Sequence, residues 1–143
     1  MLRVTYVKKT ARRPLDLIPM AMSVVQAGFP SPAEDYLENS LNLHDLVVQH
    51  PAATFYVRVS GDSMREAGIH SGDLLVVDRS LEPGDGKIVV AVINGEFTVK
   101  RLKMGPRGIL LAAENASYPD LSISPDSDFQ IWGVVTYVIH RAR

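Results

Sequence analysis

The chain has 143 residues, which fits one domain, and a domain of this length buries roughly 70% of its unfolded surface without a metal or disulfide. It contains no cysteine, which excludes disulfide scaffolds and cysteine-ligated metal sites. The net charge of −1 argues against a chain that binds nucleic acid over its whole surface, and no apolar run reaches the roughly 18 residues of a membrane span. We therefore expect a cytoplasmic protein without a cofactor.

The first residues are charged differently from the rest. Residues 1–27 hold five basic residues and one acid, a net charge of +4, whereas the remaining ten basic and fifteen acidic residues give −5. A basic arm that lies against an acidic body and a solvated tail both fit this distribution. Residues 28–36, GFPSPAEDY, predict an extended linker, because proline disfavours helix at itself and at its predecessor. The predicted organisation is an arm (1–27), a linker (28–36) and a body (37–143).

The body is rich in strand patterns. A short helix is predicted at about 42–49, with Asn42 as its cap and Pro51 beyond its end. Strands are predicted at 54–60, 73–79, 108–113 and 131–141, together with a hairpin whose strands meet at Asn94-Gly95, a strong turn signal. The sequence therefore predicts a mostly β, antiparallel and strongly bent domain with one short helix.

Ser63 follows the 54–60 strand in the turn Gly61-Asp62-Ser63. Amides at such a turn point toward the serine oxygen and form a natural site for an oxyanion, which suits a nucleophile. Ser63 and Glu66 also form an S-x-x-E capping pattern, and the local pattern alone favours a helix cap. The four histidines, at positions 44, 50, 70 and 140, have no metal-binding spacing, and surface or packing roles are expected for them.

Lys100 lies in the second strand of the predicted hairpin, with Thr98 and Leu102 on the same face. A lysine with the ordinary pKa of about 10.4 is only ~0.1% neutral near pH 7.4, so it is a poor base. Burial lowers this pKa, and a buried lysine can deprotonate a serine without a histidine. Alternatively, Lys100 belongs to a solvated basic edge with Arg101 and Lys103.

Five segments resemble one family. AGFPSPAEDYLE, SGDSM, SGDLLVVDRS, GEFTVKRL and IWGVVTYVI, in this order, resemble the UmuD/MucA-like SOS mutagenesis proteins and, more distantly, the C-terminal domain of LexA-type Ser-Lys autoproteases. The resemblance implies a LexA C-terminal-domain-like β fold with an extended N-terminal arm. It implies Ser63 as the nucleophile, Lys100 as the general base and Ala27–Gly28 as the bond that is cut. By weaker analogy, the amides of Ser63 and Asp62 form the oxyanion site.

The same resemblance implies a function. The chain is expected to be a homodimeric serine peptidase that cuts itself when a RecA–single-stranded-DNA filament stimulates it. The truncated form then joins a UmuC-like Y-family DNA polymerase in error-prone translesion synthesis, with no sequence-specific DNA binding and no membrane. Two alternatives are a non-catalytic polymerase-binding module and a LexA- or phage-repressor-type autoprotease that lacks its DNA-binding domain.

The arm also carries a candidate motif for the replication β-clamp. Leu15, Asp16, Leu17 and Ile18 in PLDLI are similar to a Q-L-x-L-F clamp peptide, although the glutamine is absent and isoleucine replaces phenylalanine. The alternative is that these apolar side chains dock the arm on the body.

Overall fold

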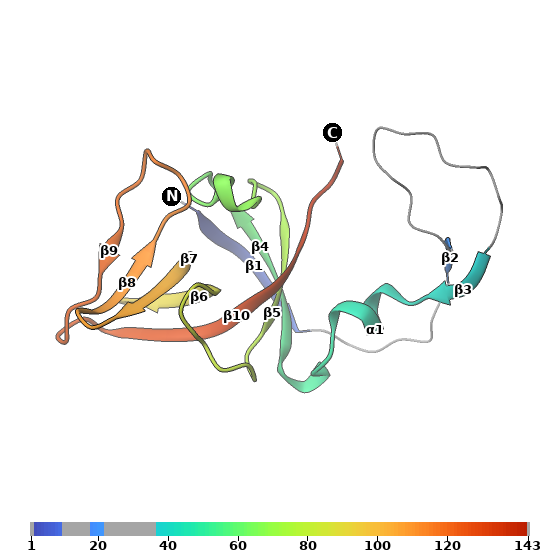
Figure 1. Cartoon of the computed structure of the whole chain (residues 1–143), viewed down its shortest axis with the longest axis horizontal. Helices are drawn as coiled ribbons and strands as arrows, with labels where there is room; N and C mark the ends of the chain where they lie inside the picture. The colour runs from blue at the N-terminus through green and yellow to red at the C-terminus, as the bar shows by residue number, and fades with distance from the viewer. Residues whose placement is uncertain (1, 10–17, 22–36, 143) are drawn as a thin grey trace. The chain divides into compact units, whose positions relative to one another are not determined.

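The computed structural model describes residues 2–9, 18–21 and 37–142. The chain groups into two units, one formed by Met1–Ala11 with His50–Arg143 and the other by Arg12–Gln49. Figure 1 shows the strands of the larger unit wrapped around one another. The division into arm, linker and body stays a prediction.

The larger unit is built from eight antiparallel strands. They are β1 (Arg3–Lys9), β4 (Thr54–Ser60), β5 (Leu74–Asp78), β6 (Ile88–Ile93), β7 (Glu96–Gly105), β8 (Gly108–Ala112), β9 (Leu121–Ser122) and β10 (Phe129–Ile139). Their order in the sheet is β1-β4-β5-β10-β6-β7-β8-β9. Two short 3-10 helices, η1 (Pro51–Ala53) and η2 (Arg65–Ala67), flank β4.

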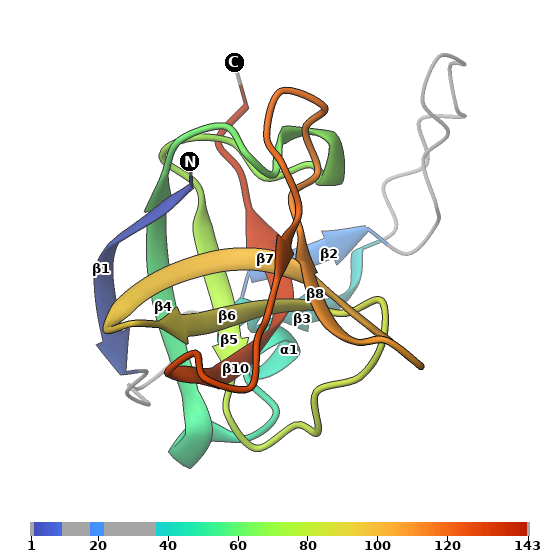
Figure 2. The same ribbon diagram turned by 90° about the vertical axis from the view of Figure 1, so that its left-hand side faces the viewer.

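The sheet closes on itself through its first strand. β1 pairs along β4, and Arg3 also pairs with Thr98 of β7. This second pairing joins β1, β4, β5, β10, β6 and β7 into a ring, which β8 and β9 extend. Figure 2 shows β1 in blue alongside β4, with β7 crossing nearby. The mostly β, strongly bent antiparallel fold predicted from the sequence is confirmed.

The strand predictions followed from side-chain alternation and turn chemistry. β4 occupies the predicted residues, with Val57 and Val59 buried and Arg58 exposed between them. The β6–β7 hairpin turns at Asn94 and Gly95, whose φ angles of 50° and 82° fit the Asn-Gly turn. Four strands were not predicted from the sequence: β1, β2 (Ile18–Ala21), β3 (Leu37–Leu41) and β9.

Two apolar clusters fill the larger unit. The first holds Leu2, Val57, Val59, Met64, Ile69, Leu75, Val77, Val90 and Val99. The second holds Val89, Ala91, Leu102, Leu111 and Val134. Met64 and Ile69 flank η2, so the turn that carries Ser63 is anchored in the first cluster.

The smaller unit contains the antiparallel pair β2–β3 and the helix α1 (Leu43–Val47). Asn42 is the N-cap of α1, and its side-chain oxygen accepts a hydrogen bond from the His44 amide. The short helix predicted from the Asn42 signal is therefore confirmed.

β10 bends where it changes neighbours. Its first half pairs with β6 and its second half with β5, and the register shifts between Ile131 and Gly133. A Cβ atom at Gly133 would lie 2.6 Å from Cγ1 of Val77, closer than side chains approach one another. The bend thus depends on a residue without a side chain.

We expect Gly133→Ala to destabilise the fold by about 1–3 kcal/mol, because the methyl group overfills a packed site. Gly105→Ala is the matched control, since Gly105 also lies in a strand and a Cβ there meets no atom within 4 Å. Urea unfolding followed by circular dichroism measures both variants. Equal midpoints would show that β10 accommodates the methyl group.

Candidate functional site

Ser63 is fully buried in the turn between β4 and η2. Its Oγ accepts a hydrogen bond from the amide of Leu2 at 2.8 Å. The residue that caps η2 is Met64, with no side-chain capping bond, and the Glu66 amide donates to the Glu114 carbonyl. The capping interpretation of Ser63 is therefore wrong, because partners distant in sequence replace the local pattern.

The loop at residues 114–118, which follows β8, is hydrogen-bonded to the serine turn. The Ser63 carbonyl accepts from the Glu114 amide at 2.8 Å, and Asn115 Nδ2 donates to the Asp62 carbonyl at 2.9 Å. The Tyr118 hydroxyl donates to Asp62 Oδ1 at 2.5 Å. These bonds fix the backbone on both sides of the Ser63 amide, so the turn has little freedom to reorient.

Lys100 lies in β7 opposite Val89 of β6, and only 3% of its surface is exposed. Thr98 and Leu102, on the same face, are also buried. Burial lowers the pKa of Lys100 below its usual value, and the Asp120 carboxylate opposes this shift. The solvated-edge interpretation is wrong for Lys100, although Lys103 on the same strand is exposed. The structure thus holds an amine that loses its proton more easily than an ordinary lysine.

Two residues connect the surroundings of Ser63 and Lys100. Tyr118, bonded to Asp62, also places its ring centroid 6.0 Å from Lys100 Nζ. Leu2 donates to Ser63, and its neighbour Arg3 pairs with Thr98, two residues before Lys100 in β7. The serine turn and the lysine strand are therefore connected through Tyr118 on one side and the start of β1 on the other.

The Tyr118–Asp62 bond also shifts both pKa values. The bond from Tyr118 lowers the pKa of Asp62, and the same bond raises the pKa of the Tyr118 phenol. Asp62 is consequently an ionised carboxylate at neutral pH, and Tyr118 stays a donor. The negative charge of Asp62 strengthens the hydrogen bond from Tyr118, and this bond stabilises the charge, in the residue before Ser63.

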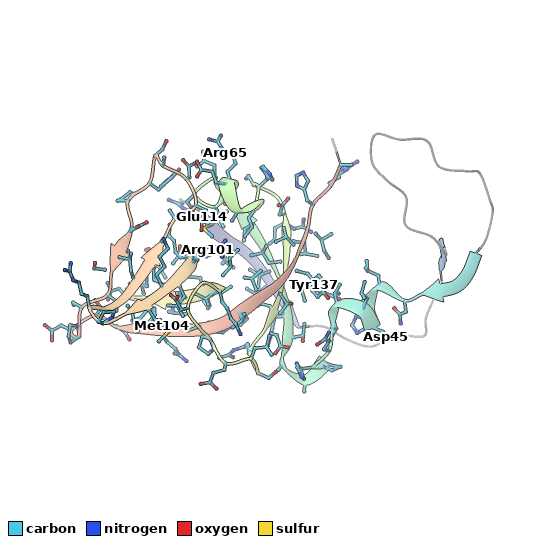
Figure 3. All side chains as sticks on the ribbon, in the orientation of Figure 1. Asp45, Arg65, Arg101, Met104, Glu114 and Tyr137 are labelled. Atoms are coloured by element: carbon cyan, nitrogen blue, oxygen red, sulfur yellow. The ribbon has the colours of Figure 1, made fainter. Side chains whose placement is uncertain are left out.

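An ion pair connects the lysine strand to the loop that holds Ser63. Arg101 Nε donates to Glu114 Oε1, and Arg101 Nη1 donates to the Gly86 carbonyl at 2.6 Å. Figure 3 labels Arg101 and Glu114 in this part of the sheet. Because the Glu114 backbone bonds to Ser63, the pair couples β7 to the serine turn. Glu114, Asn115 and Tyr118 were not predicted from the sequence as parts of the site.

Several predicted site residues remain untested. Ala27, Gly28, Leu15, Asp16 and Leu17 lie outside the described residues, and Ile18 pairs with Leu41 at the start of β2. The oxyanion role of the Ser63 and Asp62 amides stays a prediction.

Two histidines contact buried carboxylates at the two ends of β5, one in its last residue and one in the residue before its first. His50 Nδ1 lies 2.6 Å from Asp78 Oδ2, and His140 Nδ1 lies 2.6 Å from Asp73 Oδ1. Within residues 2–9, 18–21 and 37–142, no three acidic or histidine side chains gather as metal ligands would. None of the described helices is long and apolar enough to cross a bilayer.

Comparisons with known proteins identify the family of this chain. The family model described as Peptidase S24-like matches residues 19–136. MucA of Salmonella typhimurium is 52% identical over 121 residues, which span 84% of this chain and 82% of MucA. SamA of Salmonella typhimurium strain LT2 is 51% identical over 125 residues, or 87% of this chain and 86% of SamA.

A more distant relative is the LexA repressor of Paracidovorax citrulli, which is 37% identical over 117 residues. The match spans 82% of this chain but 52% of the repressor. The resemblance inferred from the five sequence segments is confirmed. The chain belongs to the S24-like family of serine peptidases and, within it, to the UmuD-like group that includes MucA, SamA and ImpA.

Proposed function

We propose that the chain is a Ser-Lys autoprotease that cuts its own Ala27–Gly28 bond and thereby becomes an accessory subunit of an error-prone DNA polymerase. The observation that carries this proposal is the buried Lys100, whose pKa is lowered, on the strand that Tyr118 and the start of β1 connect to the turn of the fully buried Ser63. A desolvated amine can accept the proton of a serine without the help of a histidine. Membership of the S24-like family supports the same chemistry.

The reaction begins with a proton transfer. The neutral amine of Lys100 takes the proton from the Ser63 hydroxyl while Oγ attacks the carbonyl carbon of Ala27. The amides of Ser63 and Asp62 donate hydrogen bonds to the oxyanion that forms. When the intermediate collapses, the C–N bond to Gly28 breaks and the Lys100 ammonium gives its proton to the departing amine.

Hydrolysis then frees the enzyme. Water attacks the ester between Ser63 and Ala27, Lys100 accepts the proton of that water, and Ser63 regains its hydroxyl as residues 1–27 leave. Small residues at the bond suit a narrow groove, and glycine lets the backbone bend into it. Because the substrate is part of the same chain, its effective concentration is high and one slow turnover is sufficient.

The relatives favour an accessory subunit over a repressor. The chain is 52% identical to MucA but 37% identical to the LexA repressor. In this proposal the chain is a cytoplasmic homodimer of the SOS response. A RecA–single-stranded-DNA filament stimulates its cleavage, and the product joins a UmuC-like Y-family polymerase. The segment Leu15–Ile18 is proposed as a contact with the β-clamp.

Ser63→Ala should abolish release of residues 1–27. It should also lower the free energy of unfolding by about 1–3 kcal/mol, because the buried Leu2 amide loses its acceptor. Mass spectrometry after alkaline incubation should find a fragment that begins at Gly28 in the wild type alone. Ser71→Ala removes a neighbouring hydroxyl, which accepts from the Gly61 amide, and should still cleave. Cleavage by folded Ser63→Ala would exclude Ser63 as the nucleophile.

The cleavage rate without RecA should rise with pH as a single titration and then level off. Lys100 must be neutral to act, and its pKa lies below the usual 10.5, so the rise should be complete before an ordinary lysine has titrated. The rate of intact-chain loss from about pH 7 to 10.5 tests this.

Two variants complete the pH experiment. Lys100→Arg should be inactive throughout, because guanidinium does not deprotonate in this range. Lys103→Arg, at an exposed position of the same strand, should keep the wild-type profile. A flat wild-type profile, or an active Lys100→Arg protein, would show that another group is the base.

Tyr118 is proposed as a positioning residue. Tyr118→Phe keeps a ring near Lys100 but removes the bond to Asp62, so cleavage should slow by roughly tenfold or more with the pH midpoint unchanged. Tyr118→Ala also removes the ring, so water should reach Lys100 and move the midpoint to higher pH. Tyr137→Phe, at an exposed position in β10, is the control. Identical midpoints for the Tyr118→Phe and Tyr118→Ala proteins would show that the ring does not shield Lys100.

A further inference from the structure

The first strand joins β4, which leads into the serine turn, to β7, which carries the lysine. Arg3 pairs with Ser60, the last residue of β4, and also with Thr98 of β7. Leu2 is fully buried and belongs to the first apolar cluster. A peptide that lies in extended form between two strands, bonded to both, is the arrangement by which sheet edges bind a peptide ligand.

The place that β1 occupies is the place a substrate needs. Ser63 follows Ser60 by three residues, and Lys100 follows Thr98 by two, so the start of β1 lies where both strands lead into the site. A cleavable peptide must bring a carbonyl carbon to about 3–3.5 Å from Ser63 Oγ. Here that oxygen instead accepts a hydrogen bond from the Leu2 amide at 2.8 Å. The bound strand presents a donor to the nucleophile and is not placed for attack.

Beside β1, the part of the chain that the structure describes leaves a polar group unpaired and an apolar surface exposed. Thr98 Oγ1 is buried and has no hydrogen-bond partner among the described residues. Beside β1 lies a cavity of about 720 Å³, whose apolar lining includes Val4, Ile93, Phe97 and Leu121. Phe97 and Leu121 are 41% and 40% exposed. A different strand could therefore use a polar group and an apolar surface that β1 leaves unused.

We propose that residues 2–9 are a pseudosubstrate strand, which occupies the peptide groove between β4 and β7 and must leave before the cleavage segment can bind. The competition with cleavage rests on the proposed function. The binding of an extended peptide in place of β1 does not rest on the proposed function. Binding and cleavage can therefore be tested separately.

A disulfide provides the sharpest test, because the chain contains no cysteine of its own. Arg3 and Ser60 are paired across β1 and β4, and paired positions of antiparallel strands lie within the Cα separation that a disulfide bridges. Oxidised Arg3→Cys/Ser60→Cys protein should cleave at roughly one tenth of the reduced rate or less, and reduction should restore the rate. Arg3→Cys alone should not respond to oxidation. Unchanged cleavage in the oxidised double variant would overturn the proposal.

A second variant releases the strand. Leu2→Asp places a charge at a fully buried position, which should expel the start of β1 and raise the cleavage rate several-fold. Val7→Asp puts the same charge on the same strand at a position that is 37% exposed, so its effect should be much smaller. Equal rates for the wild type and Leu2→Asp, with circular dichroism showing both folded, would contradict the pseudosubstrate role.

Binding is measured independently of catalysis. The probe is a fluorescent peptide of residues 22–33, and the protein is the Arg3→Cys/Ser60→Cys chain with Lys100→Met, so that no cleavage occurs. Fluorescence anisotropy should show tighter peptide binding in the reduced than in the oxidised form. Such a difference would support the inference even if the wild type never cleaves. The absence of cleavage would refute the proposed function but not the inference. Equal binding in both forms would overturn the inference.

Discussion

A lysine amine held away from water is the constraint on which the site depends. The β6–β7 hairpin places Lys100 between Thr98 and Leu102 on a buried face, and the buried charge is costly there. The folded chain therefore binds this proton more weakly than the unfolded chain, whose lysine has the usual pKa of 10.5. Between the lowered pKa and 10.5 the unfolded state holds more protons, so the free energy of unfolding rises with pH across that interval. Burial of Lys100 therefore has two effects: it lowers the stability of the fold at low pH, and it makes the neutral form of the amine more available.

The serine turn is rigid because contacts distant in sequence hold it. Asn115 and Tyr118 reach Asp62 from 53 and 56 residues away, and Glu114 bonds to the Ser63 carbonyl. Arg101, next to Lys100 in β7, binds the Glu114 side chain. Strand and turn are thus connected through one loop, so a shift of β7 is transmitted to Ser63. Such support fixes both groups without a direct bond between them.

Local rules predicted much of the body. Alternation located β4, Asn94-Gly95 located the hairpin turn, and Asn42 located the helix cap, because each signal acts between near neighbours. The alternation of Leu2, Val4 and Tyr6 was a signal for β1, but the basic residues around it dominated the interpretation. The loop at 114–118 carries no such signal, since its partners are set by the folded topology. The capping pattern at Ser63 was wrong for the same reason: the Glu66 amide finds the Glu114 carbonyl instead.

In the proposed mechanism, displacement of β1 alone is not enough for cleavage. Ser63 has no exposed surface in the state in which Leu2 is bonded to it, so the occupying strand is part of what keeps the site dry. If β1 left and nothing replaced it, water would enter beside Lys100, and hydration would raise the pKa of its amine. Lys100 would then be protonated when the Ser63 hydroxyl was free. Only a second strand that takes the place of β1 both frees Ser63 Oγ from the Leu2 amide and keeps the amine neutral. In the proposed mechanism, self-cleavage is therefore an exchange of strands, and any stimulus that accelerates it must favour the exchanged state over both the occupied and the open one.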